Sequence, residues 1–194
     1  FRVAVMLSSP EAEVDLAYQD CLQGVVDKLA RLGVTISDKA RPEVDTARAF
    51  EVYITLLRAA TSRRSSKEEL KYFAQVLADA NIDKGTYLAC MAQGVIMPHR
   101  EWLDWDNERE GMRLAWANFF NEWDILLCPA ATSDAWPHDQ EGERHNRTIT
   151  VNNKQQSVVD QMFWAGFPCM VYLPSTVAPA GLSPAGLPLS LIHI

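Results

Sequence analysis

The first 40 or so residues place one amphipathic helix between two apolar runs, and this order restricts the fold more than any other feature of the sequence. RVAVML (2–7) and VTIS (34–37) are typical of short buried strands. Between them, apolar residues recur at alternating spacings of four and three, which places them on one helical face: Tyr18, Leu22, Val25, Leu29 and Leu32. Gly33 follows as an expected helix stop. This strand–helix–strand unit predicts a parallel or mixed sheet of the α/β class.

The turn after the first strand argues against a dinucleotide site. Dinucleotide-binding units carry G-x-G-x-x-G there, because glycine lets the backbone approach the pyrophosphate. The residues at this point are SSPEAEVD (8–15), which contain no glycine. No cofactor and no metal are expected, since Cys and His also lack the spacings typical of metal ligands.

The stretch from Val44 to about Trp123 is expected to be mostly helical. Four windows without a central proline show helical periodicity: 45–62, 65–81, 83–97 and 108–123. We expect a helical sub-lobe of about residues 44–122 inside one domain of residues 1–194, because no linker-like boundary separates it. The Trp-rich acidic segment 99–124 is interpreted as core packing with a solvated acidic face, since base-stacking platforms come with basic grooves.

The last third of the chain is predicted to contain mainly short strands rather than long helices. Two apolar runs are predicted strands: DILLCP (124–129) and CMVYLP (169–174). A short strand with an Asn-Asn turn is predicted at TITVNN (148–153). An amphipathic helix that stops at Gly166 and Pro168 is predicted at QSVVDQMFWAGFP (156–168). We therefore expect a sheet of residues 2–7, 34–37, 124–128 and 169–173, with the 44–122 helices mainly on one side.

The segment STVAPAGLSPAGLPLSL (175–191) is unusual in carrying three prolines, two glycines and no charge. We interpret it as tightly turned backbone rather than strand, because proline cannot donate to a sheet ladder. Such backbone suits a site that a neutral group must approach closely.

Composition narrows the possible partners. A net charge of −7 argues against nucleic acid or an anionic membrane surface, and no apolar run approaches the roughly 20 residues of a membrane span. The four scattered cysteines are expected to be reduced, buried and inert, which favours the cytoplasm. The absence of an initiator Met or signal peptide at Phe1 suggests that the sequence begins inside a longer protein.

Two polar clusters have both a catalytic and a structural interpretation. Ser66 beside Lys67 resembles a nucleophile with its base, but Ser66 and Glu69 also form the S-x-x-E pattern of a helix capping box, which we favour. His138 and His145 lie in a polar loop, and no G-x-S-x-G motif accompanies them. We expect a solvated loop there.

Two segments resemble the amidase signature family. FFNEWDILLCPA (119–130) is similar to one of its strands, and RTITVNNKQQSVVDQMFWAGFPCMVYLPSTVAPAGLSPAGLPLS (147–190) is similar to a later segment that ends in GLP. RVAVMLSSPEAEVD (2–15) also resembles the region that follows the family's catalytic core. The chain departs from the family at Leu189–Ile194, which read as a foreign or truncated end.

The resemblance implies an incomplete amidase fold, a mixed central sheet flanked by helices. It also implies hydrolysis of small carboxamides or esters by a Lys, a cis-peptide-linked Ser and a nucleophilic Ser that precede the matched segments. No catalytic residue is carried over, because the chain has no Gly/Ser-rich run; its partners are expected to be the substrate and the missing N-terminal half.

Four residues are expected to border the substrate pocket. Cys128 and Pro129 end a strand, where α/β sites open, and Asp160 and Trp164 are spaced to share one helical face. Two other functions remain open: a non-catalytic α/β binding domain, and a subunit of a glutamyl-tRNA amidotransferase. The second is disfavoured by the acidic charge.

Overall fold

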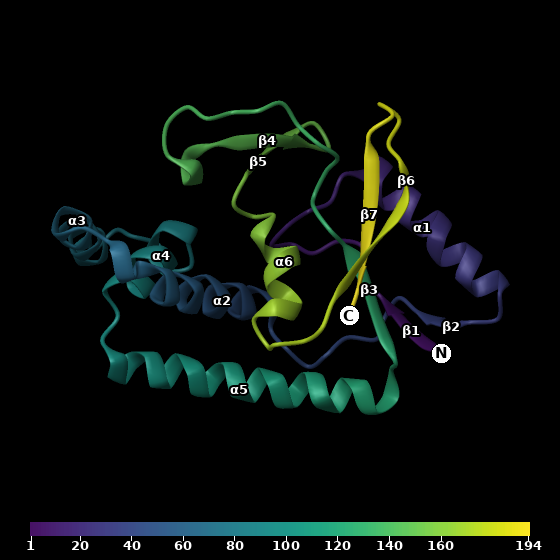
Figure 1. Ribbon diagram of the computed structural model, residues 1–194, viewed down its shortest axis with the longest axis horizontal. Coiled ribbons are helices and arrows are strands. Elements are labelled where there is room, and N and C mark those ends of the chain that lie inside the picture. The colour runs from purple at the N-terminus through teal and green to yellow at the C-terminus, as the bar shows by residue number, and fades with distance from the viewer.

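The computed structural model describes residues 1–194 and is organised around a five-stranded mixed sheet (Figure 1). The strand order is β2-β1-β3-β7-β6. The strands are β1 (Arg2–Val5), β2 (Thr35–Ser37), β3 (Ile125–Pro129), β6 (Thr176–Leu182) and β7 (Pro188–His193). Strand β1 pairs in parallel with both β2 and β3, whereas β7 is antiparallel to β3 and β6. The predicted mixed α/β sheet is therefore confirmed.

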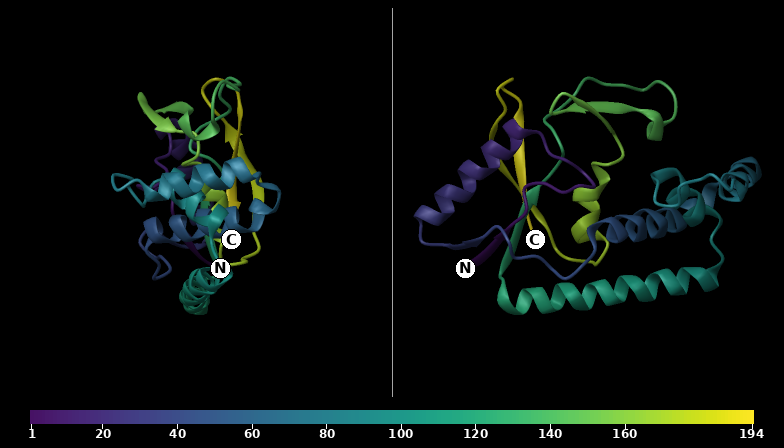
Figure 2. Two further views of the ribbon diagram at one scale, coloured as in Figure 1. Left: turned by 90° about the vertical axis from the view of Figure 1, so that its left-hand side faces the viewer. Right: turned by 180° about the vertical axis from the view of Figure 1, so that it is seen from behind.

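Helices cover both faces of this sheet (Figures 1 and 2). Helix α1 (Leu16–Arg31) packs on one face against β2, β6 and β7. Helix α6 (Met162–Cys169) lies on the other face, with α2 (Thr46–Thr61) packed behind it. None of the helices has the length and apolar character that crossing a membrane requires.

The middle of the chain is helical, as expected. Helix α3 (Lys67–Ala78), α4 (Tyr87–Ile96) and α5 (His99–Glu122) follow α2, with a short 3₁₀ turn at Ser62–Arg64. They lie on the α6 side of the sheet (Figure 1). The capping box that opens α3 is present: the Ser66 hydroxyl accepts from the Glu69 N–H at 3.1 Å, and the Glu69 carboxylate accepts from the Ser66 N–H at 2.7 Å.

An aromatic cluster joins α6 to α2 and α5. The ring of Phe167 lies 4.9 Å from Trp116 of α5 and 5.2 Å from Phe163, which in turn lies 6.0 Å from Phe50 of α2. Trp116 and Phe163 are almost fully buried. The Trp-rich segment is thus core on its inner side, as predicted.

Short-range signals in the sequence placed several turns correctly. Gly33 follows α1 with φ +84°, which favours glycine. Asn152 and Asn153 have φ of 50° and 62° and join β4 (Thr148–Val151) to β5 (Lys154–Ser157) as an antiparallel hairpin. The expected apolar stripe of α1 is shorter than predicted, because Leu32 lies beyond the helix and is exposed.

The strand predicted at 169–173 does not form. Helix α6 continues through Gly166 and Pro168 to Cys169, and the chain then turns, with Tyr172 at φ +61° and its N–H donating to the Cys169 carbonyl. Gly166 does not stop the helix: a Cβ there would lie 2.3 Å from the Tyr53 ring, so its small size lets α6 approach α2.

The segment 175–191 is a β-hairpin rather than only tight turns, which corrects the sequence interpretation. Its prolines lie at positions of the sheet where a missing N–H donor is tolerated. Strand β6 is an edge strand, its register shifts between Pro179 and Gly181, and Pro188 is the first residue of β7. Within the terminal LSLIHI, residues 191–193 pair with β3, with Cys128 opposite Ile192, and residues 189–193 also pair with β6.

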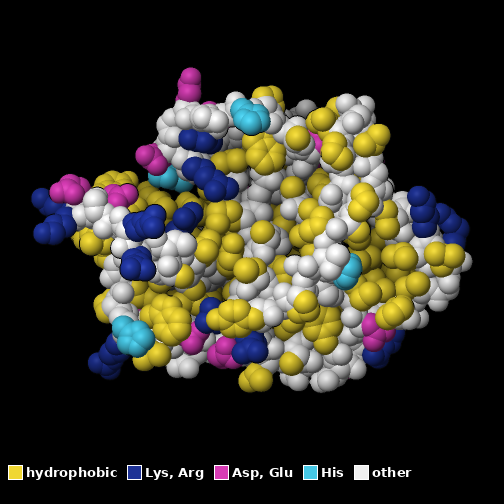
Figure 3. Space-filling view, viewed as in Figure 1, with side chains coloured by type: hydrophobic (Ala, Val, Ile, Leu, Met, Phe, Trp, Pro, Cys, Tyr) yellow, Lys and Arg dark blue, Asp and Glu magenta, His cyan; other side chains and the backbone are white.

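Apolar side chains remain exposed along the outer strand of this hairpin. Val177 and Leu182 of β6 are exposed, and only one neighbour, β7, pairs with this strand. Figure 3 shows apolar side chains spread over the centre of the face that carries α6 and the hairpin. This edge of the sheet is open to a further strand.

Gly94 sets the distance between α2 and α4. A Cβ at this position would lie 2.2 Å from the Thr55 carbonyl oxygen and 2.8 Å from the Arg58 Cβ. We predict that Gly94→Ala lowers the free energy of unfolding by about 1–3 kcal/mol, because overpacking outweighs the gain in helix propensity. Urea titration of the purified protein measures this.

Gly111 of α5 is the matched control, since a Cβ at this position would have no atom within 4 Å. Gly111→Ala should raise the free energy of unfolding by up to about 1 kcal/mol through helix propensity alone. Equal effects of the two substitutions would contradict close packing at Gly94.

Candidate functional site

The carboxyl ends of the parallel strands β1 and β3 meet at one edge of the sheet, and a cavity of about 620 Å³ lies there. We call it the loop cavity. Its walls come from the start of α1, the loop 133–139 after β3, strand β4 and the 183–185 turn between β6 and β7. Its volume falls within the roughly 300–1,000 Å³ range of small-molecule sites, and α/β sites open at this end of the strands.

Tyr18 ties one wall of the loop cavity to the sheet. Its hydroxyl donates to the Ser190 carbonyl oxygen of β7 at 2.5 Å, and burial raises the pKa of this phenol above its usual value. Apolar surface around it comes from Ile149 and Leu189, while Trp136 stands in the exposed loop. The arrangement offers an apolar wall and a fixed hydroxyl.

The charged residues that line the loop cavity are all acidic, apart from His138. They are Asp15, Asp134 and Asp139, and no Lys or Arg lines it. Asp15 also caps α1 by accepting from the Ala17 N–H at 2.9 Å. An uncompensated anionic lining disfavours anionic ligands and admits neutral or cationic ones.

Arg147 holds the loop beside this cavity in place. Its guanidinium donates to three backbone carbonyls: Asp139 at 2.8 Å, Gly142 at 2.8 Å and Glu141 at 3.1 Å. Three charge-assisted hydrogen bonds from one rigid group restrict the loop 139–142, which has no strand or helix of its own.

The structure places the four predicted pocket residues in different surroundings. Cys128 is fully buried in the core, and burial raises the pKa of its thiol to about 12. Pro129 is buried at the end of β3. Trp164 is fully buried, and its indole Nε1 donates to the Ala12 carbonyl at 3.2 Å. None of these residues, nor Asp160, lines the loop cavity, so their role at a substrate cleft stays a prediction.

Asp160 does not share a helical face with Trp164. Helix α6 begins at Met162, so Asp160 lies in the preceding turn, where its carbonyl accepts from the Phe163 N–H. Its carboxylate is half-buried, and desolvation raises the pKa of this group to about 6. A carboxyl group that titrates near neutrality is a feature often seen at functional sites.

Sequence reasoning assigned His138 to a solvated loop and missed the lining roles of Tyr18 and Trp136. His138 is exposed, as expected, yet it lines the loop cavity. One signal was available: Trp136 is a large aromatic residue in an otherwise polar loop directly after a buried strand.

The Ser66–Lys67 pair is a helix cap, as expected. The structure holds no group of three His, Cys, Asp or Glu side chains placed to bind a metal, and the expectation that the protein uses no metal stays a prediction. All four cysteines are unpaired; Cys90 and Cys128 are buried, but Cys169 is exposed, contrary to expectation.

Comparison with known proteins gave one family and several similar folds. The amidase family model matches residues 1–194. A search of curated proteins found no match. The chain resembles a bacterial aryl acylamidase of the amidase signature family, with TM-score 0.68 and 15% identity, over 100% of this chain and 39% of that one.

Two further structures show the same fold. A 6-aminohexanoate cyclic dimer hydrolase aligns with TM-score 0.63 and 19% identity, over 99% of this chain and 40% of that one. An allophanate hydrolase from Kluyveromyces lactis aligns with TM-score 0.52 and 16% identity, over 100% of this chain and 29% of that one. The chain thus spans about 40% of the length of the first two structures.

Removing the Arg147 guanidinium should release the loop beside the cavity. We predict that Arg147→Met lowers the NMR order parameters of the backbone at residues 139–142, because three hydrogen bonds to their carbonyl oxygens are lost, without unfolding the sheet. Arg144→Met is the control, since the Arg144 side chain makes no hydrogen bond or ion pair. Unchanged order parameters in Arg147→Met would show that other contacts hold the loop.

Asp160 should make stability depend on pH. Its pKa of about 6 lies above the usual 3.8, so the folded protein binds the extra proton between these values and loses stability as pH rises through them. Asp160→Asn should therefore raise the melting temperature at about pH 7.5, and the difference should vanish below about pH 4. Asp20→Asn, at an exposed position on α1, should change little.

Proposed function

Because this chain belongs to the amidase family, we propose that it forms the C-terminal part of an enzyme that hydrolyses the carbon–nitrogen bond of small carboxamides, or the corresponding bond of esters. The observation that carries this proposal is the family match over residues 1–194. The loop cavity, at the strand ends where α/β sites open, supplies a place for the substrate.

The nucleophile and its base are proposed to come from another part of the same enzyme. This chain spans only about 40% of the first compared structures, and its resemblance to the family lies in segments that follow the Lys and Ser residues of the mechanism. In that mechanism the serine oxygen attacks the carbonyl carbon and the C–N bond breaks. The amine leaves with a proton, and water then hydrolyses the acyl-enzyme.

The residues of this chain are proposed to bind and orient the substrate. Tyr18, Trp136 and Leu189 offer apolar surface for its body, and the loop cavity contains no Lys or Arg to attract a carboxylate. Substrates that are uncharged or bear an amine are therefore favoured over anionic ones. The open edge at β6 is the proposed junction with the strands of the remaining part.

The chain by itself should not hydrolyse amides, and the whole enzyme should. The chain alone is also expected to be poorly soluble or partly unfolded, since β6 exposes Val177 and Leu182 on an unpaired edge. Purified chain and whole protein should be compared on a panel of aryl and aliphatic amides. Turnover by the chain alone that disappears in Ser66→Ala or His138→Ala would place the chemistry here and contradict the proposal.

Within the whole enzyme, Trp136→Ala should lower kcat/KM for neutral amides by about tenfold or more, because apolar contact with the substrate is lost. Tyr72→Ala, an exposed aromatic residue on α3 far from the loop cavity in the fold, is the matched control. The same assay on Asp160→Asn and Trp164→Ala tests the predicted pocket role of those residues. Equal kinetics for Trp136→Ala and the parent enzyme would remove the loop cavity from the substrate path.

A further inference from the structure

A second cavity, of about 310 Å³, lies inside the helical part of the molecule, away from the loop cavity. We call it the helical cavity. Its walls come from α2, α4, α5, the end of α3 and the loop between α3 and α4. None of its lining residues lines the loop cavity, so the two are separate.

We propose that the helical cavity binds a small uncharged molecule that has an apolar body and one hydroxyl or carbonyl group. Such a ligand is independent of the amide substrate. Three features of the cavity define its chemistry: a buried hydroxyl without a partner, an apolar and aromatic wall, and charged side chains that are paired, apart from the exposed Lys84.

The buried hydroxyl belongs to Thr55 of α2. Thr55 is fully shielded from solvent, lines the helical cavity, and its Oγ1 makes no hydrogen bond. The thiol of Cys90 lies beside Thr55 and donates to the Lys84 carbonyl oxygen at 3.7 Å. Burial raises the pKa of that thiol to about 11, although the adjacent Thr55 side chain acts to lower it. A buried hydroxyl without a partner destabilises the folded protein, and a ligand that hydrogen-bonds to it recovers part of this loss.

The apolar wall suits a flat or compact body. Leu77, Ile82, Ala89 and Trp105 contribute it, from α3, the α3–α4 loop, α4 and α5. One face of the Trp105 ring is occupied by the Arg48 guanidinium, whose central carbon lies 4.4 Å from the ring centroid. The indole is thereby fixed as a rigid surface.

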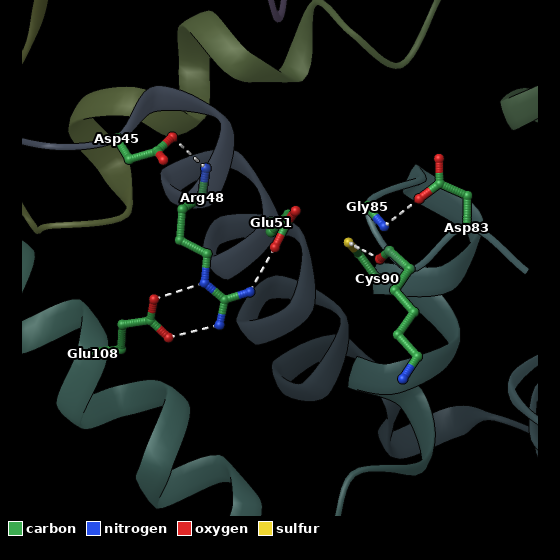
Figure 4. A network of polar contacts seen from close by, with 8 residues as sticks. Asp45, Arg48, Glu51, Asp83, Gly85, Cys90 and Glu108 are labelled. Atoms are coloured by element: carbon green, nitrogen blue, oxygen red, sulfur yellow. Dashed lines mark hydrogen bonds and ion pairs between the residues drawn. The ribbon is translucent and has the colours of Figure 1, made fainter.

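The half-buried charges at the helical cavity, Arg48 and Glu51, are paired within the protein. Arg48 donates to both oxygens of Glu108, at 2.7 and 2.8 Å, and to Glu51 at 2.5 Å (Figure 4). These two carboxylates raise the pKa of the guanidinium, so it stays charged and paired. Lys84 also lines the cavity, but it is exposed and makes no ion pair. A charged ligand would lose its hydration without gaining a buried counter-charge, which favours an uncharged one.

The test uses benzyl alcohol as the probe, with benzoate and benzylammonium as charged isosteres. NMR titration of the Trp105 indole N–H in the purified whole protein should show saturable binding of benzyl alcohol, with Kd on the order of 1 mM. Both charged isosteres should bind at least about tenfold more weakly. Equal binding of benzoate or benzylammonium, or no saturable shift, would overturn the proposal.

Thr55→Val removes the hydroxyl while nearly preserving the shape of the side chain. It should weaken benzyl alcohol binding by about three- to tenfold and raise the melting temperature of the ligand-free protein. Thr55→Ser, which keeps the hydroxyl, should bind nearly as the parent does. Undiminished binding in Thr55→Val would show that the hydroxyl does not contact the probe.

Two controls separate this site from others. Thr61→Val alters an exposed threonine of the same helix, whose hydroxyl is already bonded to the Leu57 carbonyl at 2.9 Å, and should leave binding unchanged. Trp136→Ala alters the loop cavity and should also leave the Trp105 titration unchanged. Loss of the Trp105 response in Trp136→Ala would place the probe in the loop cavity and overturn the proposal.

Discussion

The packing of α6 against α2 and α5 is the interaction on which the rest of the structure depends. Phe163 and Phe167 of this short helix insert between Phe50 and Trp116, and Gly166 lets the helix backbone approach the Tyr53 ring. Buried apolar residues of α2, α5 and α6 share one core cluster with residues of β1, β3 and β7. Aromatic rings from three helices meet in this contact, which joins α2 and α5 to α6.

Two long-range hydrogen bonds then position the segments that form the loop cavity. The Trp164 indole donates to the Ala12 carbonyl, which anchors the segment after β1 on α6. The Asp15 N–H donates to the Thr132 carbonyl at 2.7 Å, which joins the start of α1 to the loop after β3. Buried backbone groups need such partners, and these place two segments more than 100 residues apart in sequence at one end of the sheet. Trp164 therefore supports the candidate site from the core without lining it.

The two cavities differ in the charges of the side chains that border them. The loop cavity presents acidic side chains without a basic partner, whereas the helical cavity is bordered by an arginine that two carboxylates neutralise. The first arrangement selects among ligands by charge, and the second selects for the absence of charge.

Local signals in the sequence determined much of the fold. The helix α1 itself, the capping box of α3, Gly33 after α1 and the Asn152–Asn153 turn depend on neighbouring residues only, and the structure bears them out. The buried stripe of α1 was predicted only in part, since Val26 is buried rather than Val25 and Leu32 lies beyond the helix. The resemblance of 147–190 to the amidase family also came from the sequence, and the family match agrees.

Tertiary structure decided the rest of the fold and the candidate site. Pro179 and Pro188 fit strands because one lies on a sheet edge and the other begins a strand, and residues 169–173 turn because β7 takes the place beside β3. Likewise, Tyr18, Trp136 and His138 meet in one cavity, and Asp160 is separated from Trp164, because of long-range packing that no local pattern records.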